Sequence, residues 1–116
     1  MTKQRVNYIA RYQKLWESCR IIEERLDEVM GIVTRLEKNR PIYEEIEKAT
    51  TVPWYLILVI HQKECSGSLQ RHLHNGDSLT ARTINHPPNR PANGMAPFTF
   101  IDSAIDGLMM KEDKIP

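Results

Sequence analysis

The sequence is short, close to neutral and poor in aromatic residues, and these absences exclude several classes of protein. Its 116 residues carry a formal net charge of +1, from 16 Lys and Arg against 15 Asp and Glu. A charge so close to zero gives no long-range attraction to nucleic acid or to an anionic membrane. No nucleic-acid partner is therefore expected.

Cysteines and long apolar runs are equally scarce. Cys19 and Cys65 are far apart and form no Cys-x-x-Cys pair, so neither a zinc ribbon nor a thioredoxin-like redox pair is predicted. The longest apolar run, residues 52–60, is interrupted by Pro53 and is about half the ~20 residues that a membrane span needs. Residues 1–11 lack the apolar core of a signal peptide. These features predict no membrane span and a cytoplasmic chain.

The first third of the sequence has the periodicity of an amphipathic helix. Residues 6–39 are good helix formers, and their apolar residues recur at helical spacing, so the pattern predicts one long helix. The charged residues opposite this stripe are interpreted as a solvated face. The apolar residues form two successive stripes, of which the second lies opposite the charged face: Ile9, Tyr12, Leu15, Trp16 and Cys19, then Ile22, Leu26, Val29, Met30, Val33 and Leu36.

Two further helices are expected in the middle of the chain. Arg40 and Pro41 are typical of a helix start, since proline is tolerated in the first turn, and this helix is expected to end near Thr50. Thr51 is expected to cap the next helix, residues 54–64. Because that helix is apolar nearly all round, it is predicted to be the central, buried one.

Residues 66–100 are expected to be irregular. This stretch contains three of the five glycines and four of the seven prolines, and long irregular segments in compact domains are usually functional or disordered. The residues near 79–84 have strand propensity, which leaves room for a short β-hairpin. A final helix over residues 104–112 is predicted, with Asp102 or Ser103 as its cap.

Glu64 lies at the predicted end of the apolar helix, where a carboxyl group has a chemical use. Partial burial and the negative C-terminal end of a helix both disfavour a carboxylate and raise its pKa. Such an acid can stay protonated near neutral pH and donate its proton to a leaving oxygen. The alternative is an ordinary exposed glutamate at a helix end.

The sequence of this region resembles that of lytic transglycosylases and goose-type lysozymes. The stretch VPWYLILVIHQKECS, residues 52–66, is similar to their apolar helix that ends in a catalytic Glu-Ser, with Cys65 in place of the serine. The continuation RHLHNGDSLTART, residues 71–83, and PPNRPANGMAPFTFIDSAIDGL, residues 87–108, resemble phage and proteobacterial lysozyme-like endolysins more closely. In that family the domain continues into an aromatic-rich half that this chain does not contain.

The resemblance implies a mainly α, lysozyme-like helical domain over residues 1–116, with the irregular segment 66–100 as its active-site loop. It implies a peptidoglycan glycosidase that cleaves bonds between N-acetylmuramic acid and N-acetylglucosamine, with Glu64 as general acid. Asp77 is the candidate second carboxylate, and Thr83 a candidate for holding water. The alternatives are a turn carboxylate for Asp77 and a strand residue for Thr83.

Further side chains of the loop are candidates for substrate binding: His72, His74, Asn75, Thr80 and Arg82. His72 and His74, together with His61, raise the question of a zinc site. His-x-His alone supplies only two ligands, so hydrogen bonding is the favoured interpretation and no metal or other cofactor is predicted. A thiol nucleophile at Cys65 would need a base such as His61, but no oxyanion-forming pattern accompanies that pair.

The function predicted from sequence is therefore peptidoglycan cleavage, by a chain that reaches the periplasmic wall only if it is released. Hydrolysis, a transglycosylase outcome, and inversion or retention at the sugar all remain open, because carboxylate separation is not fixed by sequence. The rival reading is a helical interaction module without catalysis, whose uncovered apolar faces pair with another chain or copy.

Overall fold

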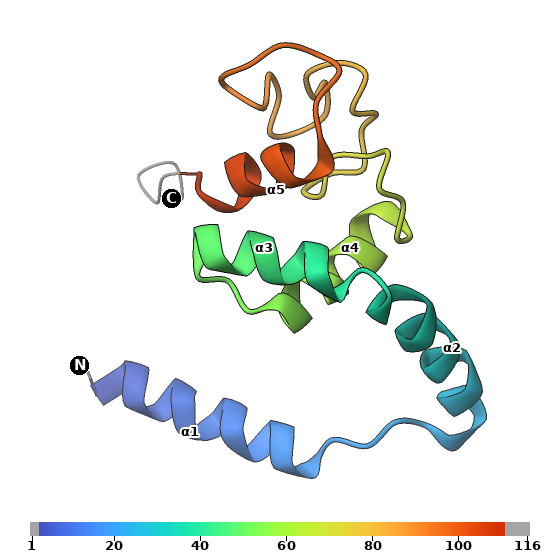
Figure 1. The fold of residues 1–116 in the computed structure, drawn as a ribbon. Coiled ribbons are helices and arrows are strands. Elements are labelled where there is room, and N and C mark those ends of the chain that lie inside the picture. Colours follow the sequence, from blue (N-terminus) through green and yellow to red (C-terminus); the bar gives the residue numbers. More distant parts are fainter. Residues whose placement is uncertain (1–2, 111–116) are drawn as a thin grey trace. The chain divides into compact units, whose positions relative to one another are not determined.

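The protein is mainly helical in the computed structural model, which describes residues 3–110 (Figure 1). The helices of this part are α1 (Lys3–Ser18), the 3-10 turn η1 (Glu23–Arg25), α2 (Leu26–Glu37), α3 (Arg40–Thr50), α4 (Trp54–Cys65) and α5 (Phe100–Leu108). Residues 1–31 and residues 32–116 form two separate compact units. The first unit holds α1, η1 and the start of α2.

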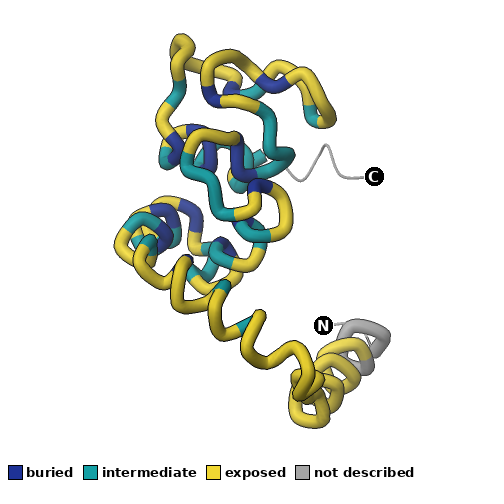
Figure 2. The backbone as a smooth tube through the Cα atoms, turned by 90° about the vertical axis from the view of Figure 1, so that its right-hand side faces the viewer, coloured by how far each residue is buried: buried dark blue, intermediate teal, exposed yellow. Residues whose placement is uncertain are grey.

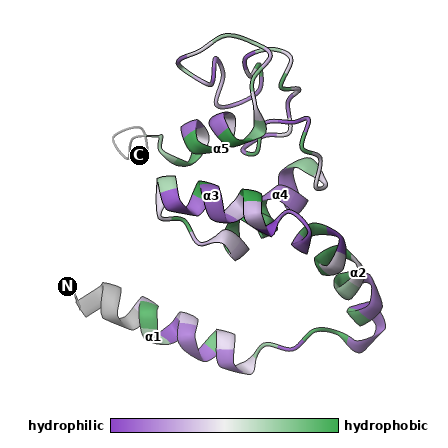
Figure 3. Cartoon of the chain, in the orientation of Figure 1, coloured by the Kyte–Doolittle hydropathy of each residue, from purple (hydrophilic) through white to green (hydrophobic). Residues whose placement is uncertain are grey.

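The first unit has no buried side chain among its described residues. All described side chains of α1 are exposed, and Trp16 is 79% exposed; Figure 2 shows this helix as exposed along its described length. Apolar residues still recur along it, as the hydropathy colouring in Figure 3 shows. The periodicity that predicts a helix here therefore belongs to a stripe of exposed apolar side chains.

The prediction of one continuous helix over residues 6–39 is wrong, because α1 ends at Ser18 and residues 19–22 are not helical. Side chains bind the carbonyl groups at and just beyond the end of α1. The Ser18 hydroxyl donates to the Leu15 carbonyl, and the Arg20 guanidinium donates to the carbonyls of Glu17 and Cys19. Ile22 is then extended, with φ −61° and ψ 125°. This local bonding competes with helix propagation, and helix propensity alone does not reveal it.

Helix α3 agrees with its prediction, but the cap of α4 does not. Pro41 lies in the first turn of α3, which ends at Thr50 as expected. Thr51 has a left-handed backbone, with φ 65°, and closes α3 instead of capping α4. The N–H of Trp54 is bound 3.1 Å away by a carboxylate oxygen of Glu47. A side chain of α3 thus supplies the acceptor at the start of α4.

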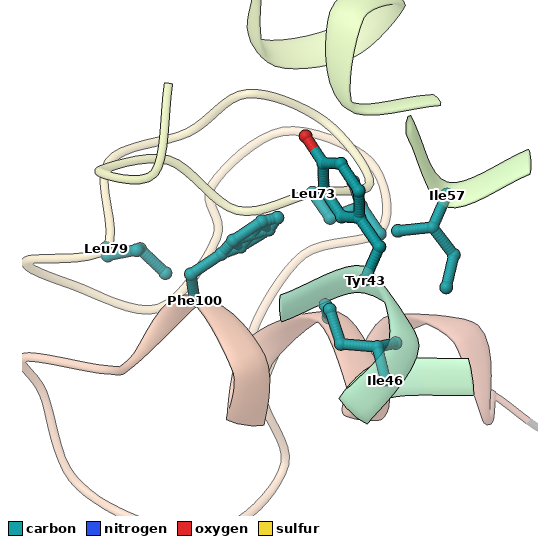
Figure 4. Close-up of a cluster of buried hydrophobic side chains, with 7 residues drawn as sticks. Tyr43, Ile46, Ile57, Leu73, Leu79 and Phe100 are labelled. Atoms are coloured by element: carbon teal, nitrogen blue, oxygen red, sulfur yellow. The ribbon is translucent and has the colours of Figure 1, made fainter. Parts of the chain in front are cut away.

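The core of the second unit lies between α3, α4, α5 and the loop before α5. Helix α3 packs against both α4 and α5. Figure 4 shows the labelled core side chains converging from these elements. The buried cluster consists of Tyr43, Ile46, Ile57, Leu73, Leu79, Phe100 and Ala104. Loop residues thus help to complete the core, which ties the loop's conformation to the helices.

The nearly all-apolar composition of α4 predicts burial on every side, but only one face of this helix is buried. Ile57, His61 and Cys65, one turn apart, are its buried residues, while Tyr55, Leu56 and Val59 are 61%, 45% and 57% exposed. Ile57 belongs to the same buried core cluster as Ile46 of α3. Leu26, Met30 and Val33 of α2 are exposed as well.

Helix α5 begins earlier than predicted. It starts at Phe100, and its cap is Thr99, whose hydroxyl accepts from the N–H of Asp102 at 3.1 Å. The capping role expected for Asp102 or Ser103 is therefore wrong, and Ser103 is free to bond elsewhere. The helix ends at Leu108; the predicted end at Glu112 lies outside the described residues.

Residues 66–99 contain neither helix nor strand. The expected strand near residues 79–84 does not form, because the backbone there pairs with three different segments. Leu79 donates to Gln70 and accepts from Phe98, while Thr83 donates to Arg90. An isolated antiparallel bridge between Arg71 and Ser78 is all that resembles the predicted hairpin. Within the described part, no helix is both long and apolar enough to cross a membrane.

Candidate functional site

Glu64 lies in the last turn of α4, and its side chain is exposed. The partial burial expected for this carboxyl group is therefore not found. The buried face of α4 passes through His61 and Cys65, so Glu64, adjacent to Cys65, falls on the solvent side. Any removal of water from Glu64 has to come from a bound molecule.

The chain turns back sharply after α4, which brings the following loop onto the helix end. Ser66 and Gly67 have positive φ values of 51° and 78°, a common way to end a helix. The buried thiol of Cys65 lies 3.1 Å from the carbonyl oxygen of His72. The loop that carries the His-Leu-His-Asn-Gly-Asp sequence thus packs against the C-terminal end of α4.

Gly76 marks the closest approach between this loop and Glu64. A Cβ atom at residue 76 would lie 2.5 Å from the carbonyl oxygen of Glu64, and the φ of Gly76 is +80°. Only glycine meets both conditions without strain. The sequence therefore needs Gly76 for the loop to lie directly on the residue predicted to be the acid.

A pocket of about 540 Å³ opens beside this contact. It is lined by Ser68, Gln70, Arg71, Gly76, Asp77 and Ser78. Its lining is mostly polar, with hydroxyl, amide, guanidinium and carboxylate groups. Such groups can bind a hydroxyl-rich or charged ligand, and Gly76 connects the pocket to the main chain of Glu64.

The carboxylate of Asp77 is occupied by donors from the same loop. It accepts from the N–H groups of Ile84 and Asn85, both at 2.9 Å, and from the side-chain amide of Asn85 at 2.6 Å. Burial alone would raise the pKa of Asp77, but the bonds from Asn85 and Ile84 outweigh it and lower the pKa. Asp77 is thus a charged acceptor that fixes residues 84–85.

Asn75 belongs to the same hydrogen-bonded group. Its side-chain oxygen accepts from the N–H of Asp77 at 2.9 Å, and its amide donates to the Asn85 carbonyl at 3.2 Å. The amide also lies 3.3 Å from the Asp77 carboxylate. Through these bonds Asn75 stabilises the turn. Its contact with substrate stays a prediction.

His72 is fully buried and links the loop to α5. Its Nε2 lies 2.8 Å from the carbonyl oxygen of Ala81, and its Nδ1 lies 2.6 Å from the hydroxyl of Ser103. Because a carbonyl can only accept, Nε2 donates its N–H to Ala81, while Nδ1 is hydrogen-bonded to the Ser103 hydroxyl. Both nitrogens are therefore used inside the protein, as the hydrogen-bonding interpretation expected.

His61 has the same arrangement with different partners, which the sequence analysis missed. Its Nε2 lies 2.8 Å from the Ser68 carbonyl oxygen and its Nδ1 lies 2.6 Å from the Tyr43 hydroxyl. Burial lowers the pKa of His61, so the neutral ring donates to Ser68 and accepts from Tyr43. This chain of bonds attaches the start of the loop to α3 and α4.

His74 lies against α5 and lacks hydrogen-bond partners. Both ring nitrogens are shielded from solvent and unpartnered in the described part of the chain. A Cβ on Gly107 would lie 2.5 Å from its Nδ1, so the missing side chain of Gly107 makes room for the ring. Burial lowers the pKa of His74, as does the neighbouring His72, while Asp106 opposes the shift.

Thr83 and Arg82 also bond within the loop. The buried Thr83 hydroxyl donates to the Pro87 carbonyl at 2.6 Å and accepts from the N–H of Arg90 at 3.0 Å. Arg82 donates to the carbonyls of Pro91 and Gly94. Thr80, by contrast, is exposed, with its hydroxyl 2.9 Å from that of Ser78. Of these three, only Thr80 lies beside a residue that lines the pocket.

An ion pair that sequence reasoning missed closes the loop on α5. Arg90 binds Asp106 with two bonds, of 2.8 and 2.9 Å, between side chains that are each 17% exposed. The two residues are sixteen apart in sequence, and no local pattern pairs them. Their contact fixes the loop end that carries the partners of Thr83.

Cys65 is unsuited to nucleophilic catalysis. Burial raises the pKa of its thiol to about 11, the nearby Glu64 adds to the shift and Arg71 opposes it. A thiol with this pKa is almost entirely protonated near neutral pH. The thiol of Cys65 is therefore not activated as a nucleophile.

The loop thus places Asp77 and Arg71 near the end of α4, where Glu64 lies. The polar groups of His72, Thr83 and Arg82 instead form hydrogen bonds within the chain. Among residues 3–110, no group of three or more His, Cys, Asp or Glu is placed to hold a metal ion. Comparison with known protein families, curated proteins and solved structures finds no match for this chain.

Proposed function

We propose that this chain is a lysozyme-like glycosidase that acts on bacterial peptidoglycan, with Glu64 as the general acid. The observation that carries the proposal is the contact of Gly76 with the Glu64 carbonyl, beside the polar pocket. It joins two sequence motifs that the resemblance associates with catalysis. The main chain of Glu64 and the loop around Asp77, thirteen residues further on, are thereby in contact.

In the proposed reaction, Glu64 donates its proton to the glycosidic oxygen as the bond to the sugar's anomeric carbon breaks. Water then supplies the hydroxyl group at that carbon, and its remaining proton restores the carboxyl group of Glu64. A glycan strand laid over the pocket would cover the exposed Glu64 and remove water from it, and this favours the protonated acid that the step requires. Asp77 would stabilise positive charge on the sugar through its field.

The loop side chains support this role by fixing the shape of the site. Asn75 and Asp77 hold the turn at residues 84–85, and His72 ties the loop to α5. We propose that Thr83 and Arg82 act in the same way, because their polar groups already bind loop atoms. Thr80 and His74 stay candidates for contact with substrate.

A second candidate function is a non-catalytic interaction module. It is favoured by exposed apolar side chains on two helices, Tyr12 and Trp16 on α1 and Tyr55 and Val59 on α4. Contiguous exposed apolar surface commonly marks sites of association. A second copy of the chain is one partner that would cover such faces.

The experiment that tests the proposal is digestion of purified peptidoglycan with the 116-residue chain, followed by mass spectrometry of the released saccharides. Hydrolysis predicts new reducing ends on N-acetylmuramic acid. A transglycosylase outcome, in which an internal hydroxyl replaces water, predicts anhydro ends instead. Release of no saccharide would refute the enzymatic proposal, and association of the intact chain with itself or with another protein would then support the module.

A further inference from the structure

The pocket beside Glu64 contains one cationic side chain, that of Arg71. The other lining residues are neutral, apart from Asp77. The guanidinium of Arg71 makes one long bond within the chain, 3.4 Å from Nη1 to the Gly76 carbonyl. None of the ion pairs found among the described residues involves Arg71. Most of its five N–H donors therefore remain free for a ligand.

Asp77 does not use these donors. Its carboxylate is bound by Ile84 and Asn85, and its contact with Asn75 lies within the same turn. The positive charge of Arg71 is thus not paired by the one carboxylate in the pocket lining. Ser68, Gln70 and Ser78 place further polar groups around the same space.

Arg82 is different, although it lies in the same loop. Its Nε and Nη2 donate to the carbonyls of Pro91 and Gly94, at 3.1 and 2.6 Å, and its guanidinium lies 5.3 Å from the ring centre of Phe98. Of these two arginines, Arg71 is the one whose side chain lines the pocket and makes a single long bond within the described part of the chain.

We propose that this pocket binds a carboxylate of a hydroxyl-rich saccharide, and that Arg71 is the residue that selects it. A planar guanidinium matches a carboxylate with two parallel hydrogen bonds. This inference rests on the proposed function for its ligand class. In peptidoglycan, the carboxylate belongs either to the lactyl group of N-acetylmuramic acid or to the attached peptide. Arg71 would therefore distinguish muramic acid units, or their peptides, from plain N-acetylglucosamine.

The test measures binding of three saccharide probes to the full chain. NMR titrations monitor it through the amide resonances of Arg71, Gly76 and Ser78. The probes are the disaccharide N-acetylglucosaminyl-N-acetylmuramic acid, its methyl ester, and N-acetylmuramyl dipeptide. In the dipeptide the lactyl carboxyl group is an amide and the free carboxylate is in the peptide. Tighter binding of the free disaccharide assigns the lactyl group, and tighter binding of the dipeptide assigns the peptide carboxylate.

Arg71→Gln should weaken binding of the preferred probe by about 10-fold to 100-fold, as for a lost hydrogen bond to a charged group, and leave the methyl ester unchanged. Arg71→Lys should restore part of the affinity. Lys63→Gln is the matched control, since it removes an exposed positive charge beside Glu64 and outside the pocket lining. Equal binding of the free disaccharide, its methyl ester and the dipeptide, or wild-type affinity for the preferred probe in Arg71→Gln, would overturn the inference.

The same titrations separate this inference from the proposed function. If carboxylate binding depends on Arg71 while peptidoglycan is not cleaved, the pocket assignment stands and the glycosidase proposal fails. If the chain cleaves peptidoglycan but its carboxylate binding does not depend on Arg71, the glycosidase proposal stands and the pocket assignment fails.

Discussion

Gly76 and the main chain of Glu64 are in direct contact, with 2.5 Å between the Glu64 carbonyl oxygen and the position that a Cβ at residue 76 would occupy. The contact makes the shape of the loop depend on the end of α4. It also makes residue 76 sensitive to the smallest substitution.

Gly76→Ala should therefore destabilise the protein, by about 1–3 kcal/mol from its positive φ and more from the overlap with the carbonyl. Chemical denaturation gives the free energy of unfolding. Gly31→Ala is the matched control, because no atom lies within 4 Å of its added methyl group. It should stabilise α2 by roughly 0.5–1 kcal/mol. Equal effects of the two changes would contradict the contact.

The two faces of α4 should respond differently to truncation. Ile57 is fully buried and Val59 is 57% exposed. Ile57→Ala should lower the free energy of unfolding by roughly 2–5 kcal/mol, whereas Val59→Ala should change it by about 0.5 kcal/mol or less. Urea denaturation of both variants checks this. A large loss in Val59→Ala would show that the outer face of α4 is covered in solution.

The buried histidines should make folding sensitive to mild acid. Burial lowers the pKa of His61 and of His74 below the ordinary value of 6.5. The unfolded chain then binds more protons than the folded chain, so stability rises with pH. The stability that these neutral rings contribute should be fully present above pH 6.5, the ordinary histidine pKa in the unfolded chain. It should be lost progressively as the pH falls from there toward the lowered pKa values of the folded chain.

Measurement of the free energy of unfolding between pH 7.5 and pH 5, as rough limits around the histidine range, tests this sign. His74→Gln should reduce the slope, because it removes one of the two groups, while His61 maintains the remainder. Stability that increases on acidification would contradict the burial of these rings.

The two cysteines should differ in reactivity with a thiol reagent. Cys19 is exposed and Cys65 is buried, with its pKa raised to about 11. Alkylation of the native protein near pH 8 should modify Cys19 and leave Cys65 intact, and denaturant should release the second thiol. Peptide mapping distinguishes the two sites. Rapid modification of native Cys65 would show that the end of α4 opens readily.

Local sequence predicts the parts of the fold that local physics controls. Pro41 marks the start of α3, and the apolar run predicts α4 and the burial of Ile57. The end of α1 at Ser18 depends on side chains that bind the final carbonyls. The cap of α4 depends on Glu47, a residue of the preceding helix. Propensity scales contain neither effect.

The sequence shows which polar residues the loop contains, but it does not show what those residues bind within the chain. The histidines and Asp77 are visible in the sequence, but their partners come from distant positions, such as Ser103 for His72 and Asn85 for Asp77. The pair of Arg90 and Asp106 has no sequence signal at all. The exposure of Glu64 follows from which face of α4 meets the core, and an almost uniformly apolar helix does not encode that choice clearly.

The most direct test of the central claim is the rate at which Glu64→Gln lyses purified peptidoglycan, beside wild type and Glu45→Gln, which alters an exposed glutamate of α3. Glutamine keeps the shape of the side chain and cannot donate an acidic proton. The account predicts a rate about 10² to 10⁴-fold lower for Glu64→Gln, with unchanged unfolding, and a wild-type rate for Glu45→Gln. Lysis by Glu64→Gln at the wild-type rate would contradict it.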